Sequence, residues 1–255
     1  MRHLLLGLTA LLLSACAIDP VPNRSCDFVI RELEVPQPSR GLGPPVPTFE
    51  EVIRQSYAAD LAVPNYLFMS GGSEKGAFGA GVIKAWGERR RGLPRFDVVT
   101  GVSTGALLAT PAFLGDYPYA AWAYSNVRES QLLKPFVRRN SSGGLSTASY
   151  LAVVKNGAVA SLDPMRNLLA DYLTDERYQA IADRAATSKL LVGAVDMESG
   201  KAVALDLTDM AVKVTRASNP NDKNHFKQCY MDAIQASASA PLAATPVYFN
   251  NRMYV

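Results

Sequence analysis

The sequence predicts an α/β protein with a mostly parallel sheet covered by helices on both faces. Short apolar runs bounded by Pro and Gly alternate with longer segments that have helical spacing. This alternation favours β-α-β units, whose parallel strands are buried under helices. The composition is that of a globular domain, since 48% of the 255 residues are hydrophobic and 19% are charged.

The first half of the domain contains two predicted strand–helix pairs. Helical spacing begins at 49–62, where acidic residues stand in the first turn. A short apolar strand at 65–70 precedes a helix over 76–91. The strand at 96–100 leads into a helix over 103–114.

The second half shows fewer clear signals, because helices and a hairpin follow one another without regular alternation. The elements expected there are a helix over 164–173 with Asp163 as its N-cap, a hairpin of 190–197 and 202–207, a helix over 228–238, and a strand over 247–255 that contains an Asn-Asn turn.

Charge and composition exclude several classes of function. The net charge is +3, from 26 basic and 23 acidic residues without a long basic stripe, so no nucleic-acid partner is expected. No apolar run approaches the roughly 20 residues of a spanning helix. Three cysteines and two histidines are too few for a disulfide scaffold or a four-thiolate zinc site, and we expect neither a metal nor a cofactor.

The first 15 residues resemble a bacterial lipoprotein signal peptide. A basic tip precedes an apolar stretch, and the sequence Leu-Ser-Ala-Cys ends at Cys16, as in a lipobox. This resemblance implies lipidation of Cys16, which would anchor the protein to a membrane. Because Ala17 rather than Asp follows, it further implies the bacterial envelope and sorting to the outer membrane. Ordinary cleavage after Ala17 is the alternative.

Residues 16–48 predict an extended tether between this anchor and a domain over 49–255. Seven prolines between positions 19 and 48 exclude a continuous helix. Cys26 lies in the tether, and Cys229 lies in the predicted helix over 228–238. In an oxidising compartment the two thiols could pair, or both could stay free, and the sequence leaves both possibilities open.

The run Gly101-Val102-Ser103-Thr104-Gly105 has the pattern of a nucleophile elbow. It lies at the end of a predicted strand and opens a predicted helix. Glycines permit the tight turn that exposes the Ser103 hydroxyl, and the helix start places positive dipole near a developing oxyanion. The alternative is that Ser103 only caps its helix.

A glycine pair, Gly71-Gly72, follows the preceding strand about thirty residues before Ser103. A right-handed crossover of that length places both strands side by side, so the loop and Ser103 meet at the carboxyl edge. The two glycine amides then form an oxyanion hole. A nucleotide loop is disfavoured because Ser73 replaces a required Gly, and Lys75-Gly76 reverses the Gly-Lys order of phosphate loops.

These motifs together resemble the patatin-like phospholipases. The run over 67–82 is similar to the family's Gly-rich loop and following helix, and 101–105 is similar to its nucleophile motif. The Ala-Ser-Ala-Ser-Ala-Pro block at 236–241 and the hairpin at 196–201 also fit. The resemblance, over about 63–255, implies a three-layer α/β/α fold. It also implies a Ser–Asp dyad that hydrolyses phospholipid or other acyl-ester lipids.

The resemblance implies a role for each matching residue. Ser103 corresponds to the nucleophile, Gly71 and Gly72 to the oxyanion donors, and Lys75 to a conserved basic position. The remaining matching motif glycines are Gly76, Gly101 and Gly105.

Two positions depart from the family pattern. Ser73 replaces the third glycine of the loop. In the family, the catalytic Asp lies in an Asp-Gly-Gly or Asp-Gly-Ala motif directly after a strand like 247–255, and no such motif occurs here. We therefore expect the domain to be C-terminally incomplete, with its Asp just beyond Val255, and this chain to have little activity alone.

Two alternatives to the dyad enzyme stay open. His225 could serve a Ser–His–Asp esterase, but we expect it in an exposed polar loop, and we expect Asp232 to face solvent. Ser73 and the missing Asp favour a non-catalytic lipid-binding or envelope-interaction lipoprotein. A cluster of aromatic residues could line an acyl groove, although core packing is favoured: Tyr117, Tyr119, Trp122 and Tyr124.

Overall fold

A computed structural model describes residues 23–32, 65–137, 144 and 146–255. The predicted signal peptide, Cys16 and the predicted helix over 49–62 lie outside these residues. In the described ranges, no helix has the length and apolar character needed to cross a bilayer.

The central sheet is parallel in its middle and antiparallel towards one side. Its strand order is β1 (Asn23–Arg24), β10 (Val247–Phe249), β11 (Arg252–Tyr254), β7 (Lys189–Asp196), β4 (Val98–Val102) and β3 (Tyr66–Met69), with β8 (Lys201–Asp206) beside β7 and β2 (Ile30–Glu32) beside β8. Strands β3 (Tyr66–Met69), β4 (Val98–Val102) and β7 (Lys189–Asp196) are parallel, and β8 (Lys201–Asp206) forms the predicted hairpin with β7. The α/β class is therefore confirmed.

The chain end adds a second hairpin, in which β10 (Val247–Phe249) and β11 (Arg252–Tyr254) are antiparallel. The predicted Asn-Asn turn joins them, and Asn250 and Asn251 have φ of 54° and 58°. Asparagine tolerates this left-handed conformation, which two-residue hairpin loops require. The single strand predicted over 247–255 is thus two short strands.

Part of the predicted tether belongs to the domain. Strand β1 (Asn23–Arg24) pairs with β10, and β2 (Ile30–Glu32) pairs with β8. Cys26, which lies between them, forms a disulfide with Cys229. The predicted boundary at residue 49 is therefore wrong for residues 23–32, because strand pairing holds them on the sheet.

The helices from the elbow region agree with prediction to within two residues, and others were not predicted. The described helices are α3 (Gly76–Arg90), α4 (Thr104–Leu114), α5 (Tyr117–Asn126), α6 (Glu129–Leu132), α7 (Thr147–Asn156), α8 (Asp163–Tyr172), α9 (Asp175–Ala182), α10 (Leu207–Arg216) and α11 (Pro220–Ala238), with a 3₁₀ turn η1 (Ser73–Lys75). A small second sheet consists of β5 (Lys134–Pro135), β6 (Ala158–Ser161) and β9 (Leu242–Ala244).

Two helix starts differ from the prediction. Helix α11 begins at Pro220 rather than Gln228, because the Asn219 side chain accepts a hydrogen bond from the Asp222 N–H (2.8 Å) and caps it. His225 therefore lies on a helix and not in a loop. Asp163 lies in the first turn of α8 instead of capping it, and its own N–H donates to Ser161 Oγ (3.0 Å).

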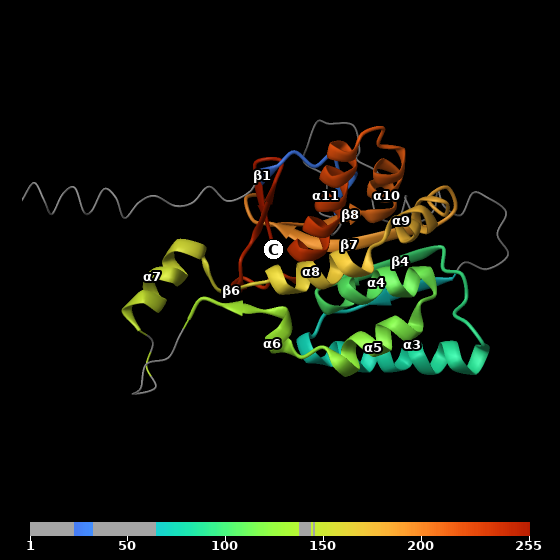
Figure 1. The fold of residues 1–255 in the computed structure, drawn as a ribbon, viewed down its shortest axis with the longest axis horizontal. Coiled ribbons are helices and arrows are strands. Elements are labelled where there is room, and N and C mark those ends of the chain that lie inside the picture. Colours follow the sequence, from blue (N-terminus) through green and yellow to red (C-terminus); the bar gives the residue numbers. More distant parts are fainter. Residues whose placement is uncertain (1–22, 33–64, 138–143, 145) are drawn as a thin grey trace, which may run out of the picture.

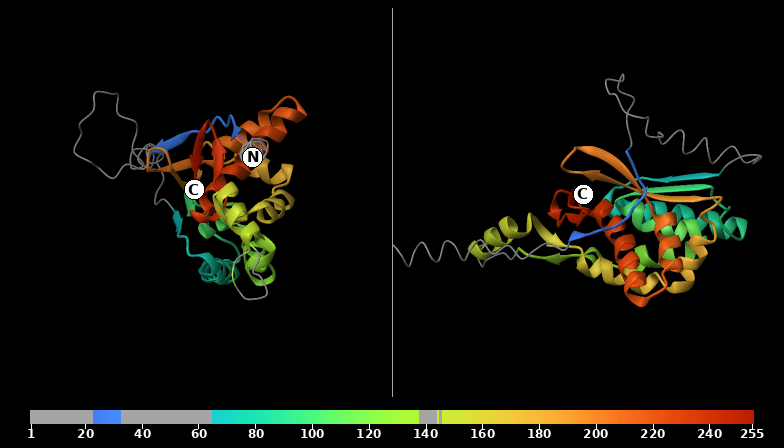
Figure 2. Two further views of the ribbon diagram at one scale, coloured as in Figure 1. Left: turned by 90° about the vertical axis from the view of Figure 1, so that its left-hand side faces the viewer. Right: turned by 90° about the horizontal axis from the view of Figure 1, so that it is seen from above.

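The described helices gather on one side of the central strands (Figure 1; Figure 2, right). Helices α4, α10 and α11 lie against β7, and α4 also covers β4. Phe68, Val102 and Val195 project from the opposite face and are substantially exposed. Among the described elements, no layer of helices covers this opposite face.

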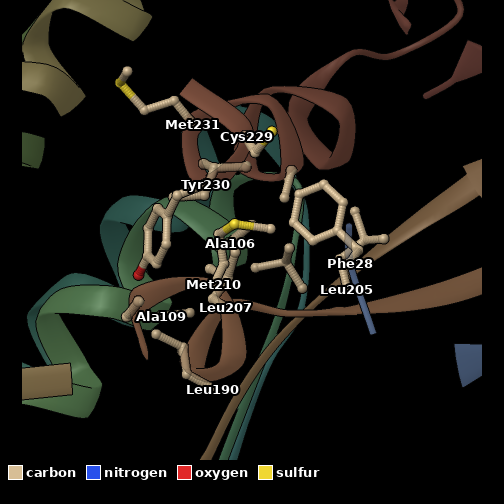
Figure 3. Packing of buried hydrophobic residues seen from close by; sticks show 14 of the residues in the cluster. Phe28, Ala106, Ala109, Leu190, Leu205, Leu207, Met210, Cys229, Tyr230 and Met231 are labelled. Atoms are coloured by element: carbon tan, nitrogen blue, oxygen red, sulfur yellow. The ribbon is translucent and has the colours of Figure 1, made fainter. Parts of the chain in front are cut away.

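The main core lies between the sheet and α4, α10 and α11. Tyr230, Met210 and Leu190 are completely buried there, beside the Cys229 end of the disulfide (Figure 3). Burying each such side chain contributes about 1.5–3 kcal/mol. The disulfide closes 203 residues of chain, which in the chain-entropy view stabilises the fold by up to about 5 kcal/mol.

Candidate active site

The turn at Ser103 has the geometry of a strained elbow. Strand β4 ends at Val102, α4 begins at Thr104, and Ser103 between them has a φ of 55°. A Cβ on Gly105 would lie 2.1 Å from the Met69 carbonyl oxygen, and one on Gly101 would lie 2.3 Å from the Gly105 oxygen. Both contacts are with backbone, so only glycine permits this turn.

The Gly71 loop reaches the same turn. Strands β3 and β4 are parallel neighbours, with Met69 opposite Gly101. A Cβ on Gly71 would lie 3.0 Å from the Ser103 Cβ and 3.7 Å from its Oγ. The β-α-β crossover therefore brings the two glycine motifs into contact at the carboxyl edge, as the sequence spacing predicts.

The rest of this loop is exposed and tightly turned. Gly72 has a φ of 149°, and its carbonyl accepts a hydrogen bond from the Lys75 N–H (3.0 Å). Ser73 has a φ of 51°, a conformation in which glycine is unstrained. The serine at this position therefore costs conformational energy that a glycine would avoid.

Tyr124 of helix α5 contacts both the elbow and the start of α3, which follows the glycine loop. Its hydroxyl donates to the Thr104 carbonyl (3.2 Å), one residue after Ser103. Burial raises the pKa of Tyr124 to about 12, although the contact with Thr104 opposes the rise. A Cβ on Gly76 would lie 2.6 Å from the same hydroxyl, so the glycine at the start of α3 admits this side chain.

The end of α11 fixes the backbone of the elbow. The Ser103 N–H donates to the Ser237 Oγ (3.0 Å), and Ser237 is buried. Ser239 instead donates to the Gln235 carbonyl (2.8 Å) within its own helix end. The family resemblance marks the Ala-Ser-Ala-Ser-Ala-Pro block, but no local pattern indicates which serine contacts the elbow.

A largely apolar cavity of about 500 Å³ opens beside Ser103. Its wall includes side chains of α4, α5, α6 and α8, among them Leu107, Leu132 and Met165. Three of the four aromatic residues line it: Tyr119, Trp122 and Tyr124. Tyr119 and Tyr124 also pack against the core clusters, so both expectations hold for these two residues, whereas Tyr117 packs against Gly87.

Comparison with known proteins agrees with this geometry. A family model described as patatin-like phospholipase matches residues 67–255. This chain belongs to the patatin-like phospholipase family. No curated protein matches the sequence. The matched range covers the glycine loop, the elbow, the cavity and the Ser237 block, and it leaves out residues 23–32 of the patatin-like domain.

Within the described residues, the Ser103 hydroxyl has no carboxylate or imidazole partner. His225 Nε2 lies 2.9 Å from the Ser25 carbonyl oxygen and 3.8 Å from the Cys229 sulfur. It precedes Ser237 by twelve helical residues, a distance of about 18 Å along α11. The imidazole is therefore far from the elbow of this patatin-like domain, which argues against a Ser–His–Asp triad.

Asp232 does not face solvent as expected. It is buried between two guanidinium groups, those of Arg166 (2.5 Å) and Arg24 (3.1 Å). Burial raises the pKa of Asp232, and the two arginines partly oppose the rise. Arg166 also donates to Gln235 (3.0 Å) and Gln228 (2.6 Å). These contacts join α8, α11 and β1, so Asp232 has a structural role in the patatin-like domain.

Proposed function

We propose that this chain is the acyl-hydrolase domain of a lipid-hydrolysing enzyme, with Ser103 as nucleophile. The observation that carries the proposal is the close approach of Gly71 to Ser103. A Cβ placed on Gly71 would lie 3.7 Å from the Ser103 Oγ. This approach puts the backbone of the glycine loop beside the hydroxyl in a turn that only glycines permit. Membership of the patatin-like phospholipase family supports lipid acyl hydrolysis at the level of the reaction.

In this mechanism the Ser103 Oγ attacks the ester carbonyl carbon while a base takes its proton. The Gly71 and Gly72 amides donate to the oxyanion of the tetrahedral intermediate. Collapse of that intermediate expels the alcohol, which takes up the proton, and leaves an acyl-enzyme. Water then attacks the acyl-enzyme by the reverse sequence and releases the fatty acid and free Ser103.

The cavity supports an aliphatic acyl chain as the group that enters the site. A volume of about 500 Å³ lies within the ordinary range of ligand pockets. Leucine, alanine and aromatic side chains dominate its wall, and Ser103 is one of the residues that line it. We propose that one acyl chain of a phospholipid or related lipid occupies it, while the head group stays outside near Lys75.

The proposed base is an aspartate placed directly after Val255. Val255 exchanges two backbone hydrogen bonds with Val195 of β7 (2.6 and 3.1 Å). In the same strand, Gly193 pairs with Val102, which precedes Ser103. Strand β11 therefore runs towards the end of the sheet at which Ser103 lies. A residue added after Val255 would approach the elbow from this strand, with β7 between β11 and β4.

We further propose a location in the bacterial envelope, with a lipid on Cys16 as an outer-membrane anchor. The lipobox-like sequence supports the anchor. The Cys26–Cys229 disulfide supports an oxidising compartment such as the periplasm. Uptake of labelled palmitate, and its loss in Cys16→Ser, tests this part. A wild-type protein that stays unlabelled in a bacterial host would leave cleavage after Ala17 instead.

The catalytic proposal is tested by appending Asp-Gly-Gly after Val255, with Asn-Gly-Gly as the matched control. The Asp form should release fatty acid from phospholipid, whereas the Asn form and the 255-residue chain should be at least about 10³-fold slower. Ser103→Ala should abolish the activity, and His225→Ala should leave it nearly unchanged. A folded Asp form without any turnover that still binds lipid would favour the non-catalytic lipid-binding protein.

A further inference from the structure

Residues 23–28 form a strap that holds the chain-end hairpin from its outer side. Strand β1 pairs in parallel with β10, so β10 lies between β1 and β11 (Figure 1, blue and red). The Asn250 N–H donates to the Arg24 carbonyl (2.8 Å). The Asn251 N–H donates to the side-chain oxygen of Asn23 (3.1 Å). The strap therefore binds both residues of the turn that joins β10 to β11.

Three side chains on one face of α11 fix the strap to the helix layer. They are spaced four and three residues apart along the helix, so they point the same way. The contacts join Cys229 to Cys26 through the disulfide, Asp232 to Arg24 (3.1 Å), and His225 to the Ser25 carbonyl oxygen (2.9 Å). Both cysteines are completely buried, and the disulfide is the covalent link of the three.

The other side of the hairpin is joined to the sheet by a short pairing. Among the described residues, one register pair connects β11 to β7, that of Tyr254 and Asp196. The Met197 N–H adds a hydrogen bond to the Met253 carbonyl (2.9 Å). The proposed base follows Val255, so the position of the hairpin sets the position of the base. A displacement of about 1 Å in a catalytic group can slow a reaction about a hundredfold, so the hold of the strap on β10 matters for the rate.

The same helix also reaches the elbow. Ser237, near the end of α11, accepts a hydrogen bond from the Ser103 N–H (3.0 Å). A continuous set of contacts therefore runs from the nucleophile through α11 and the strap to the hairpin. No residue of 23–32 lines the cavity, and this range lies outside 67–255, which the patatin-like family model matches. The strap is thus separate from the substrate pocket and from the part of the domain that the family model describes.

We propose that the strap positions the base of the hydrolase and that its disulfide makes the activity depend on oxidation. This proposal rests on the proposed function, because it needs the base after Val255. Closing the bond removes two electrons and two protons from Cys26 and Cys229, and a protein disulfide accepts them as it becomes a dithiol. In a reducing compartment the cysteines stay thiols, so the enzyme has its nucleophile and cavity there but no fixed base. The lipids of that compartment are thereby spared.

Amide hydrogen exchange tests the strap without any catalysis. The parent is the 255-residue chain with Cys16→Ser, whose two remaining cysteines form the disulfide. In Cys26→Ala with Cys229→Ala, the Met197 amide that donates to β11 should exchange at least about tenfold faster relative to the amides of β4. Ile181→Ala, at a completely buried position of α9, is the control for a general loss of stability and should speed exchange in both regions alike.

The rate of the chain extended by Asp-Gly-Gly tests the positioning itself. The double alanine variant should lower kcat at least about tenfold with little change in KM, because no strap residue lines the cavity. Asn23→Ala keeps the disulfide but removes the side-chain contact with Asn251, so it should lower kcat about threefold even if the double variant folds poorly. Ile181→Ala should leave kcat nearly unchanged. The extended parent refolded in dithiothreitol should show the low rate, and reoxidation with glutathione disulfide should restore it.

The outcomes separate this proposal from the proposed function. A folded double variant that keeps the hairpin protection or the kcat of the parent would overturn the positioning role. Equal rates of the refolded chain before and after reoxidation would overturn its dependence on oxidation. If every extended form lacks turnover while exchange at Met197 still responds to the disulfide, the proposed base is refuted and the hold of the strap on the hairpin is supported.

Discussion

The elbow and the Asp232 cluster are held in opposite ways. At the elbow, backbone packs on backbone, and Gly101 and Gly105 leave no room for a Cβ. At the Asp232 cluster, long side chains from Arg24 and Arg166 converge on one buried carboxylate. The elbow requires residues without a Cβ, whereas the Asp232 cluster requires opposite charges to be paired. A larger side chain should therefore destabilise the elbow, and the loss of a charge should destabilise the cluster.

The largest effect is expected from Gly105→Ala. The new Cβ would lie 2.1 Å from the Met69 oxygen, and backbone cannot move aside as a flexible side chain does. We expect a loss of more than about 4 kcal/mol in the free energy of unfolding, measured in urea. Gly81→Ala is the control, because nothing lies within 4 Å of its Cβ position in α3, and it should stabilise by about 0.5–1 kcal/mol. Equal effects of both would contradict the packing argument.

Asp232→Asn tests the charge cluster. The substitution keeps the shape but leaves Arg166 and Arg24 without their carboxylate. Because Arg24 is one-third exposed, we expect about 2–3 kcal/mol of destabilisation rather than the larger loss of a fully buried pair. Asp175→Asn, at the exposed pair with Lys223 and Lys227, should cost less than about 1 kcal/mol. A smaller loss at Asp232 than at Asp175 would refute the structural role.

Ser237→Ala joins the two regions, since α11 carries both Asp232 and the hydroxyl that accepts the Ser103 N–H. Losing that acceptor should cost about 1 kcal/mol of stability. In the chain extended by Asp-Gly-Gly, Ser237→Ala should lower kcat by about tenfold with little change in KM, because the nucleophile shifts while the cavity that binds the acyl chain does not. Ser239→Ala, which does not touch Ser103, should lower stability alone. Equal kcat values for the two variants would mean that the contact does not position the nucleophile.

The smallest effect concerns Asp196 at the end of β7. Burial alone would raise the pKa of Asp196, but hydrogen bonds from Ser199, the Glu198 N–H and Arg252 outweigh it and lower that pKa. A lowered pKa in the folded state adds stability above the unfolded value of about 3.9, and this stability is lost as the pH falls through the folded pKa. Asp196→Asn should therefore destabilise by about 1 kcal/mol at pH 7, and its difference from wild type should disappear as the pH falls through the lowered folded pKa of Asp196. A difference independent of pH would assign the loss to packing.

Local sequence patterns are sufficient to predict the elbow region. Strands β3 and β4, helices α3 and α4 and the meeting of their two glycine motifs follow from local spacing, because a short β-α-β crossover has one favoured hand. The hairpin of β7 and β8 was equally local. The start of α11 also has a local signal, since Asn219-Pro220 is an N-cap followed by proline at N1, so the loop predicted there is wrong.

Three features depend on contacts between residues that are remote in the sequence: the burial of Asp232, the pairing of residues 23–32 with the sheet, and the positions of the aromatic residues. Arg24 lies 208 positions from Asp232 in the sequence, and Cys26 lies 203 positions from Cys229. Helical spacing shows which side chains share a face, but whether that face meets solvent, a cavity or a distant guanidinium depends on what the rest of the chain brings to it. Burial and charge pairing arise from contacts between remote segments, whereas the conformation of a tight turn depends on the few residues that form it.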